Sequence, residues 1–114
     1  MSIPQDQIEE LLQVYPDAKQ ADEAGVTYIL LPQMETPAGC IPTHLDALLC
    51  TTPRDGYNSR LFFEQMVQGG PARNWQVQGT VRILDRNWYA ISWQTNPNLR
   101  IVQMVRVHLE ALRG

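Results

Sequence analysis

Apolar residues recur at helical spacing near the start of the chain. Ile8, Leu11, Leu12 and Tyr15 stand at i, i+3, i+4 and i+7, which places them on one face of a short helix. Pro16 disfavours helical geometry at the residue before it, so this helix is expected to end at Tyr15.

A second helical pattern runs from Ile101 to Leu112. Asn96 and Pro97 are suited to an N-cap and a first helical position, so the helix is expected to begin there. β-Branched residues lower the intrinsic helix propensity of this segment. Packing must therefore supply most of its stability.

Between the two helical patterns, short apolar runs are separated by glycine and proline, as is typical of β-strands. Three strands are predicted, at residues 26–31, 45–50 and 59–65. The tryptophan-rich stretch that follows is ambiguous. Residues 75–77 and 80–84 fit either a fourth strand or an irregular cover over the sheet, and residues 88–93 fit either a strand or a loop.

The order of these elements predicts an α+β fold. An N-terminal helix is followed by an antiparallel meander of three to four strands, a tryptophan-rich crossing segment and a C-terminal helix. Both helices are expected to cover one face of the sheet. The length of 114 residues fits one domain, spanning residues 1–114.

The charge pattern argues against a nucleic-acid partner, and the lengths of the apolar runs argue against a membrane span. Nine basic residues are scattered among twelve acidic ones, for a net charge of −3, whereas phosphate binding needs clustered Lys and Arg. No apolar run reaches the roughly 18–20 residues that span a bilayer. Because no export signal is visible, the cytoplasm is the expected location, and the two cysteines are expected to be free thiols there.

One group of residue types could carry thiol chemistry, namely Cys40, His44 and Asp46. A neighbouring base lowers the pKa of a thiol, and an acid fixes the tautomer of the base, so the trio could form a catalytic site in a proline-rich loop. The alternative is structural. Cys40 would pack as a small hydrophobe, while His44 and Asp46 share the solvent face of a strand, as its alternation favours.

The sequence predicts no metal site and no cofactor. The two cysteines and two histidines have the right donor types for zinc but lack the usual ligand spacings. No glycine-rich loop is followed by a lysine and a helix start, so no phosphate-binding loop is expected. His108, beside Leu109 on an apolar stripe, fits a histidine at the edge of the core with a satisfied hydrogen bond.

All three tryptophans lie in the second half of the chain, among tyrosines and arginines. These residue types dominate the energetics of protein interfaces. The segment therefore predicts a partner-binding surface. Its candidate residues are Tyr57, Trp75, Arg82, Arg86, Trp88 and Trp93. In the alternative interpretation, at least two of the tryptophans are core residues that cover the sheet.

These patterns together resemble a short, divergent bacterial form of the ubiquitin-conjugating enzyme superfamily. Residues 53–57 are similar to the family's proline-tyrosine turn, although the order here is Pro…Gly-Tyr. Residues 59–65 are similar to the strand that follows that turn. Residues 93–101 resemble the tryptophan-proline entry to the family's helix, with two extra residues between Trp93 and Pro97.

The chain departs from the family at the catalytic cysteine, which lies in the loop before that tryptophan. Here the corresponding residues 79–87 contain no cysteine, and without a thiolate nothing can accept a ubiquitin-like C-terminus as a thioester. The resemblance therefore implies a non-catalytic variant that keeps a binding surface. Its partner would be a ubiquitin-like protein, its activating enzyme or another component of a bacterial conjugation pathway. Such pathways are thought to serve phage defence.

Two other functions stay open at the level of the sequence. The first is an active conjugating or thiol-transfer enzyme whose nucleophile has moved to Cys40, with His44 as its base. The second is a small adaptor subunit with an unrelated fold.

Overall fold

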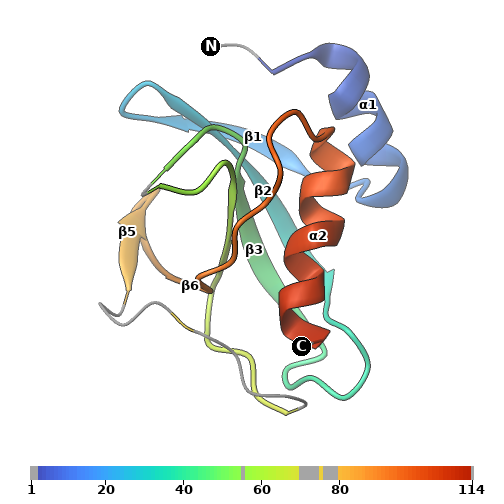
Figure 1. The fold of residues 1–114 in the computed structure, drawn as a ribbon, viewed down its shortest axis with the longest axis vertical. Helices are drawn as coiled ribbons and strands as arrows, with labels where there is room; N and C mark the ends of the chain where they lie inside the picture. Colours follow the sequence, from blue (N-terminus) through green and yellow to red (C-terminus); the bar gives the residue numbers. More distant parts are fainter. Residues whose placement is uncertain (1–2, 55, 70–74, 76–79, 114) are drawn as a thin grey trace.

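Two helices and six strands make up the part of the chain that the computed structural model describes, which is residues 3–54, 56–69, 75 and 80–113 (Figure 1). The elements in chain order are α1 (Gln5–Val14), β1 (Lys19–Glu23), β2 (Val26–Glu35), β3 (His44–Cys50), β4 (Arg60–Phe63), β5 (Val81–Ile83), β6 (Arg86–Ala90) and α2 (Ile101–Arg113). The predicted α+β class and both helices are confirmed. None of these helices is long and apolar enough to cross a membrane.

The strands form an antiparallel sheet in the order β1-β2-β3-β4-β6-β5. The first four follow the chain, as a meander does. β5 and β6 then form a hairpin, and its second strand, β6, pairs with β4. Leu84 and Asp85 connect this hairpin with φ angles of 52° and 64°, the left-handed backbone of a type I′ turn.

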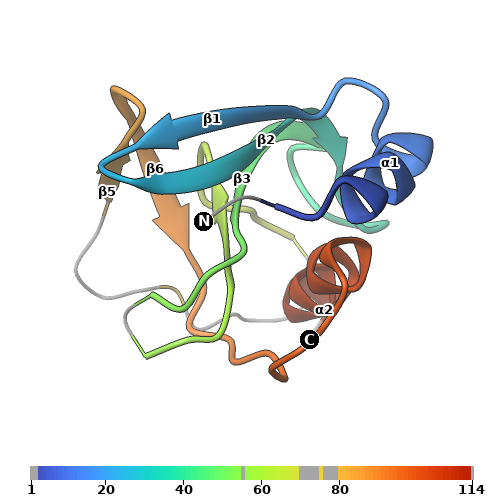
Figure 2. The same ribbon diagram turned by 90° about the horizontal axis from the view of Figure 1, so that it is seen from above.

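The sheet is strongly curled, so that its two outer strands approach each other at one corner (Figure 2). There the backbone N–H of Leu84, in the β5–β6 turn, donates a 3.0 Å hydrogen bond to the carboxylate of Glu23, at the end of β1. Both helices lie on the same side of the sheet, outside the curl.

The curl divides the apolar interior into two cores. The helix-side core lies between the sheet and the helices and includes Leu11, Leu31, Leu49, Ile101, Val105 and Leu112. The curl core lies inside the curled sheet and consists of Tyr28, Leu48, Cys50, Phe62, Ile83, Trp88 and Ala90. Successive side chains of β3 alternate between the two cores, because neighbouring residues of a strand point to opposite faces.

The second helix begins later than expected. The prediction that Asn96 and Pro97 start it was wrong, since α2 begins at Ile101. The backbone N–H groups of Arg100, just before the helix, and of Ile101, its first residue, are instead capped by two glutamine side chains. Gln103 accepts from the N–H of Arg100 at 2.9 Å, and Gln7 of α1 accepts from the N–H of Ile101 at 3.0 Å. The cap thus comes partly from the other end of the chain.

The sheet has more strands than the three to four predicted. The prediction omitted β1, because its residues are polar and mostly exposed. The expected strand at 59–65 is shorter and spans Arg60–Phe63. The ambiguous residues 80–84 and 88–93 contain parts of the β5–β6 hairpin. Trp75 forms an isolated bridge with Ile91, and the rest of the predicted segment at 75–77 lies outside the described residues.

Candidate functional site

The thiol of Cys40 lies inside the protein. Cys40 is 5% exposed, in the loop between β2 and β3, and belongs to the helix-side core. Its Sγ lies 3.9 Å from the carbonyl oxygen of Leu112, near the end of α2. The end of the C-terminal helix thus covers this cysteine.

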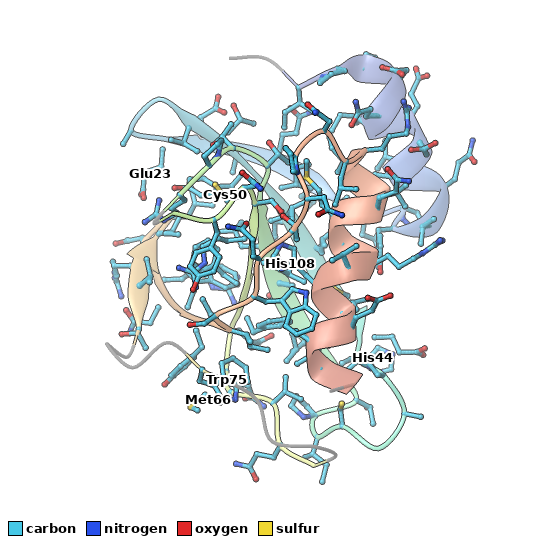
Figure 3. The ribbon with its side chains drawn as sticks, viewed as in Figure 1. Glu23, His44, Cys50, Met66, Trp75 and His108 are labelled. Atoms are coloured by element: carbon cyan, nitrogen blue, oxygen red, sulfur yellow. The ribbon has the colours of Figure 1, made fainter. Side chains whose placement is uncertain are left out.

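His44, the candidate base, lies in a different environment. It is exposed at the start of β3, with Nδ1 3.2 Å from the hydroxyl of Thr43 and Nε2 3.8 Å from the carboxylate of Glu35. In Figure 3 its ring lies at the rim of the molecule, below the middle of α2. These contacts are those of a surface histidine.

Asp46 stabilises an irregularity in the sheet. One carboxylate oxygen accepts from the backbone N–H and side-chain amide of Gln33, at 2.9 and 3.1 Å, and the other accepts from Arg86 at 3.2 Å. Gln33 lies where the register of β2 shifts and has a φ of +50°. Partial burial alone would raise the pKa of Asp46, but the hydrogen bonds from Gln33 and Arg86 outweigh burial and lower the pKa. Asp46 therefore holds a bulge and joins β3 to β6.

These contacts tie each member of the candidate thiol trio to a different group. Cys40 faces α2, His44 faces Glu35, and Asp46 holds Gln33 and Arg86. The second thiol, Cys50, is 1% exposed in the curl core, with Sγ 3.5 Å from the carbonyl oxygen of Thr52. One cysteine thus lies in each core.

Both thiols are expected to react slowly with iodoacetamide in the native protein. A buried thiol reacts only when the fold opens around it, so alkylation should be roughly 100-fold slower or more than in the unfolded chain. Mass spectrometry after timed labelling, with and without denaturant, measures each site. The Cys50→Ser variant isolates Cys40. Native Cys40 labelling at the unfolded rate would contradict the burial described here.

Trp88, one of the predicted surface residues, is a core residue. It is completely buried in the curl core, and its indole N–H donates to the carbonyl oxygen of Ile83 at 3.0 Å. The guanidinium of Arg86 lies over its ring, 4.5 Å from the centroid. Burial removes Trp88 from the predicted surface, and Arg86 is held between this ring and Asp46.

Arg82 is on the outside of the β5–β6 hairpin. Its side chain is 61% exposed and donates to Asp85 at 3.1 Å and to Asn87 at 3.2 Å. These bonds are local to the hairpin and, being exposed, are weak in water. The guanidinium can therefore exchange them for a partner's acid.

The turn that contains Tyr57 is attached to the segment before α2. Arg54 and Tyr57 exchange two backbone hydrogen bonds of 2.9 Å. The side chain of Gln94 then accepts from the N–H of Asn58 at 2.9 Å and donates to the carbonyl of Gly56 at 3.0 Å. Tyr57 is half-buried, with the guanidinium of Arg60 4.5 Å from its ring centre. The turn and the stretch after Trp93 therefore lie together.

Trp75 and Trp93 are half-buried at the edge of the helix-side core. The ring of Trp75 meets Phe63 edge-on, with centroids 5.9 Å apart and an interplanar angle of 79°. The indole nitrogen of Trp93 is buried and has no hydrogen-bond partner among the described residues. The rings of Trp75 and Trp93 therefore offer apolar contact area that is partly accessible to solvent.

Three buried polar side chains form a hydrogen-bonded cluster that the sequence analysis did not predict. Ser59, Thr95 and His108 are 1%, 3% and 5% exposed. The Ser59 hydroxyl lies 2.8 Å from the Thr95 hydroxyl and 3.0 Å from Nε2 of His108. The expectation that His108 is a core-edge histidine with a satisfied hydrogen bond is confirmed. Burial, together with the positive charge of Arg60, lowers the pKa of His108 to about 4.

A pocket of about 340 Å³ opens between the starts of both helices and the β1–β2 turn. It is lined largely by apolar side chains, including Ile3, Val26, Leu99 and Met104, with the hydroxyls of Thr27 and Thr51 beside them. None of its described lining residues has a charged or titratable side chain. Such a pocket can bind an apolar group, but it offers no general acid or base.

No group of three or more His, Cys, Asp or Glu residues is placed to hold a metal ion within the part of the chain described. Comparison of the chain with protein-family models, with curated proteins and with solved structures finds no match. Function must therefore be inferred from the residues of this chain.

Proposed function

We propose that this protein is a non-catalytic protein-binding module, similar to a ubiquitin-conjugating enzyme that lacks its catalytic thiol. The observation that carries the proposal is the burial of both cysteines, at 5% and 1% exposure, in two different cores. A carrier thiol must reach first the activated C-terminus of a ubiquitin-like protein and then an acceptor. A thiol inside a packed core reaches neither.

The region that corresponds to the family's catalytic loop supports the same proposal. Residues 81–87 contain β5, the type I′ turn and the start of β6. This hairpin packs Ile83 and Trp88 into the curl core. Strands of the sheet therefore occupy the stretch in which the resemblance places a reactive loop.

The resemblance also suggests the partner, a component of a bacterial ubiquitin-like conjugation pathway. For the contact surface we propose Tyr57, Trp75 and Trp93. The turn of Tyr57 is bonded to Gln94, next to Trp93, and Trp75 bridges to Ile91. Half-buried aromatic rings on a supported backbone lose little side-chain entropy on binding. Arg82 on the exposed hairpin offers a separate charged contact.

The test uses the purified protein with a purified bacterial ubiquitin-like protein and its activating enzyme, in the presence of ATP. We expect one of them to bind by calorimetry, with no reductant-sensitive adduct on a gel. The Cys40→Ser, Cys50→Ser double variant should bind equally well. Trp75→Ala should bind at least roughly tenfold more weakly, as the loss of an aromatic anchor does.

Val14→Ala is the matched control, because Val14 is an exposed apolar residue at the end of α1, 57% accessible. It should leave binding unchanged, and circular dichroism should show that both variants are folded. A reductant-sensitive adduct that disappears in Cys40→Ser would instead identify a thiol-transfer enzyme. Absence of binding to either component would refute the proposed pathway and favour an unrelated adaptor.

A further inference from the structure

The buried cluster of Ser59, Thr95 and His108 joins three separate parts of the chain. Ser59 immediately precedes β4, Thr95 lies in the segment that leads to α2, and His108 lies in the middle of α2. Figure 3 shows His108 directed from the helix towards the sheet. The hydroxyl of Ser59 is the centre of the cluster, bonded to both other side chains.

We propose that this cluster is a pH-sensitive latch, in which protonation of His108 releases α2 from the sheet while the curl core stays folded. The inference rests on the fold and does not depend on the proposed function. It follows from three observations, namely the burial of the cluster, the charges around it and the division of the interior into two cores.

Protonation is unfavourable in the latched state. The neutral imidazole shares a hydrogen bond with Ser59 inside the core, whereas an imidazolium is a buried cation that needs a compensating partner. The nearest charge on β4 is Arg60, only 2% exposed, which is also positive. Burial and Arg60 together hold His108 in its neutral form at neutral pH, as the lowered pKa reflects.

Among the described residues, the charged groups on the other packed elements are not placed to stabilise a protonated His108. Asp6 and Glu10 of α1 bind Arg100, at 3.1 and 2.9 Å, and Arg100 lies about 12 Å from His108 along the helix axis. On α2 itself, Arg106 and Glu110 are exposed to solvent. The β2–β3 loop contributes the Cys40 thiol, which faces Leu112. None of these described groups is placed as a buried anion beside the imidazole.

Because the interior is divided into two cores, α2 can leave the sheet without unfolding of the whole protein. The helix-side core contains Ile101, Val105 and Leu112 of α2, whereas the curl core is built from strand residues alone. Release of α2 therefore uncovers the outer face of the sheet and leaves every curl-core residue in place. Because the pKa of His108 is lowered while α2 is packed on the sheet, low pH favours release of the helix. The latch is fully closed above about pH 6.5 and loosens as the pH falls towards 4.

Hydrogen exchange of the wild-type protein, followed by mass spectrometry between pH 7 and 4, tests the latch. After correction for intrinsic rates, protection of the α2 amides should fall by up to roughly tenfold per pH unit below 6.5. Protection of the β3 amides should fall less. The His108→Gln variant, which can still bond Ser59, should lose the pH dependence in α2, while His44→Gln, at the exposed histidine, should retain it.

Equal loss of protection in α2 and β3 would overturn the latch, because it would show global unfolding. The same slope in His108→Gln would also overturn it, because other groups would then be responsible. If His108→Gln does not fold, NMR titration of the ring protons of wild-type His108 decides. The latch requires His108 to titrate well below the ordinary range of histidine and together with the chemical shifts of α2, and a His108 that titrates at an ordinary value contradicts it.

Discussion

Replacement of Trp88 by alanine is expected to lower the free energy of unfolding by about 3–5 kcal/mol, the range for large aromatic residues removed from a core. Trp88 is fully buried and is the largest side chain of the curl core. Its loss also leaves the carbonyl oxygen of Ile83 without the indole donor and Arg86 without the ring beneath it. Denaturant titration followed by far-UV circular dichroism measures the change.

Trp88→Phe is the matched control for that variant. Phenylalanine keeps an aromatic ring for the guanidinium of Arg86 but removes the indole N–H, so the expected loss is smaller than for alanine. A Trp88→Ala protein of unchanged stability that binds its partner weakly would show that Trp88 is an interface residue after all. That result would refute its assignment to the curl core.

Replacement of Gly69 by alanine is the second substitution for which we expect a large effect, a loss of roughly 2–3 kcal/mol. A Cβ at this position would lie 2.4 Å from the backbone carbonyl oxygen of Gly39. The two loops meet here through a pair of 2.7 Å backbone hydrogen bonds between Ile41 and Gln68. Relief of the overlap must separate the loops. Thermal and denaturant unfolding give the magnitude.

Gly25→Ala separates steric overlap from backbone strain. Gly25 has a φ of +79°, close to the +77° of Gly69, but no atom lies within 4 Å of the position that a Cβ would occupy there. Its substitution should cost only about 1 kcal/mol, from the left-handed backbone alone. Because Gly39 adjoins Cys40, Gly69→Ala should also speed alkylation of Cys40. Equal destabilisation by the two variants would show that the loop contact contributes nothing.

The parts of the fold that have a clear local spacing of apolar residues were predictable from the sequence. The spacing of Ile8 and Leu11 predicted α1, and the apolar runs predicted most of β2 and β3, because a half-buried helix or strand must place apolar residues at its own period. β1 has no such signal, since it is a polar edge strand. The β5–β6 turn, with Leu84 and Asp85, lacks the glycine that normally marks a type I′ turn.

The candidate surface was only partly predictable, because burial depends on contacts between distant segments. Composition identified aromatic and arginine residues but could not separate Trp88, in the core, from Trp75, at its edge. The pairing of Arg86 with Asp46 spans 40 residues, and that of His108 with Ser59 spans 49. Nothing in the local sequence of either partner specifies such pairs.

The contact between Arg100 and α1 has a kinetic consequence. The side chain of Gln7 caps the start of α2, and Asp6 and Glu10 bind Arg100, just before this helix. These contacts join residues that are as many as 94 positions apart in the sequence. Closing so long a loop costs conformational entropy, and this cost arises before the contact can contribute any stabilisation. We therefore expect the start of α2 to become ordered late in folding, after the two ends of the chain have met, and contacts formed this late slow unfolding more than they accelerate folding.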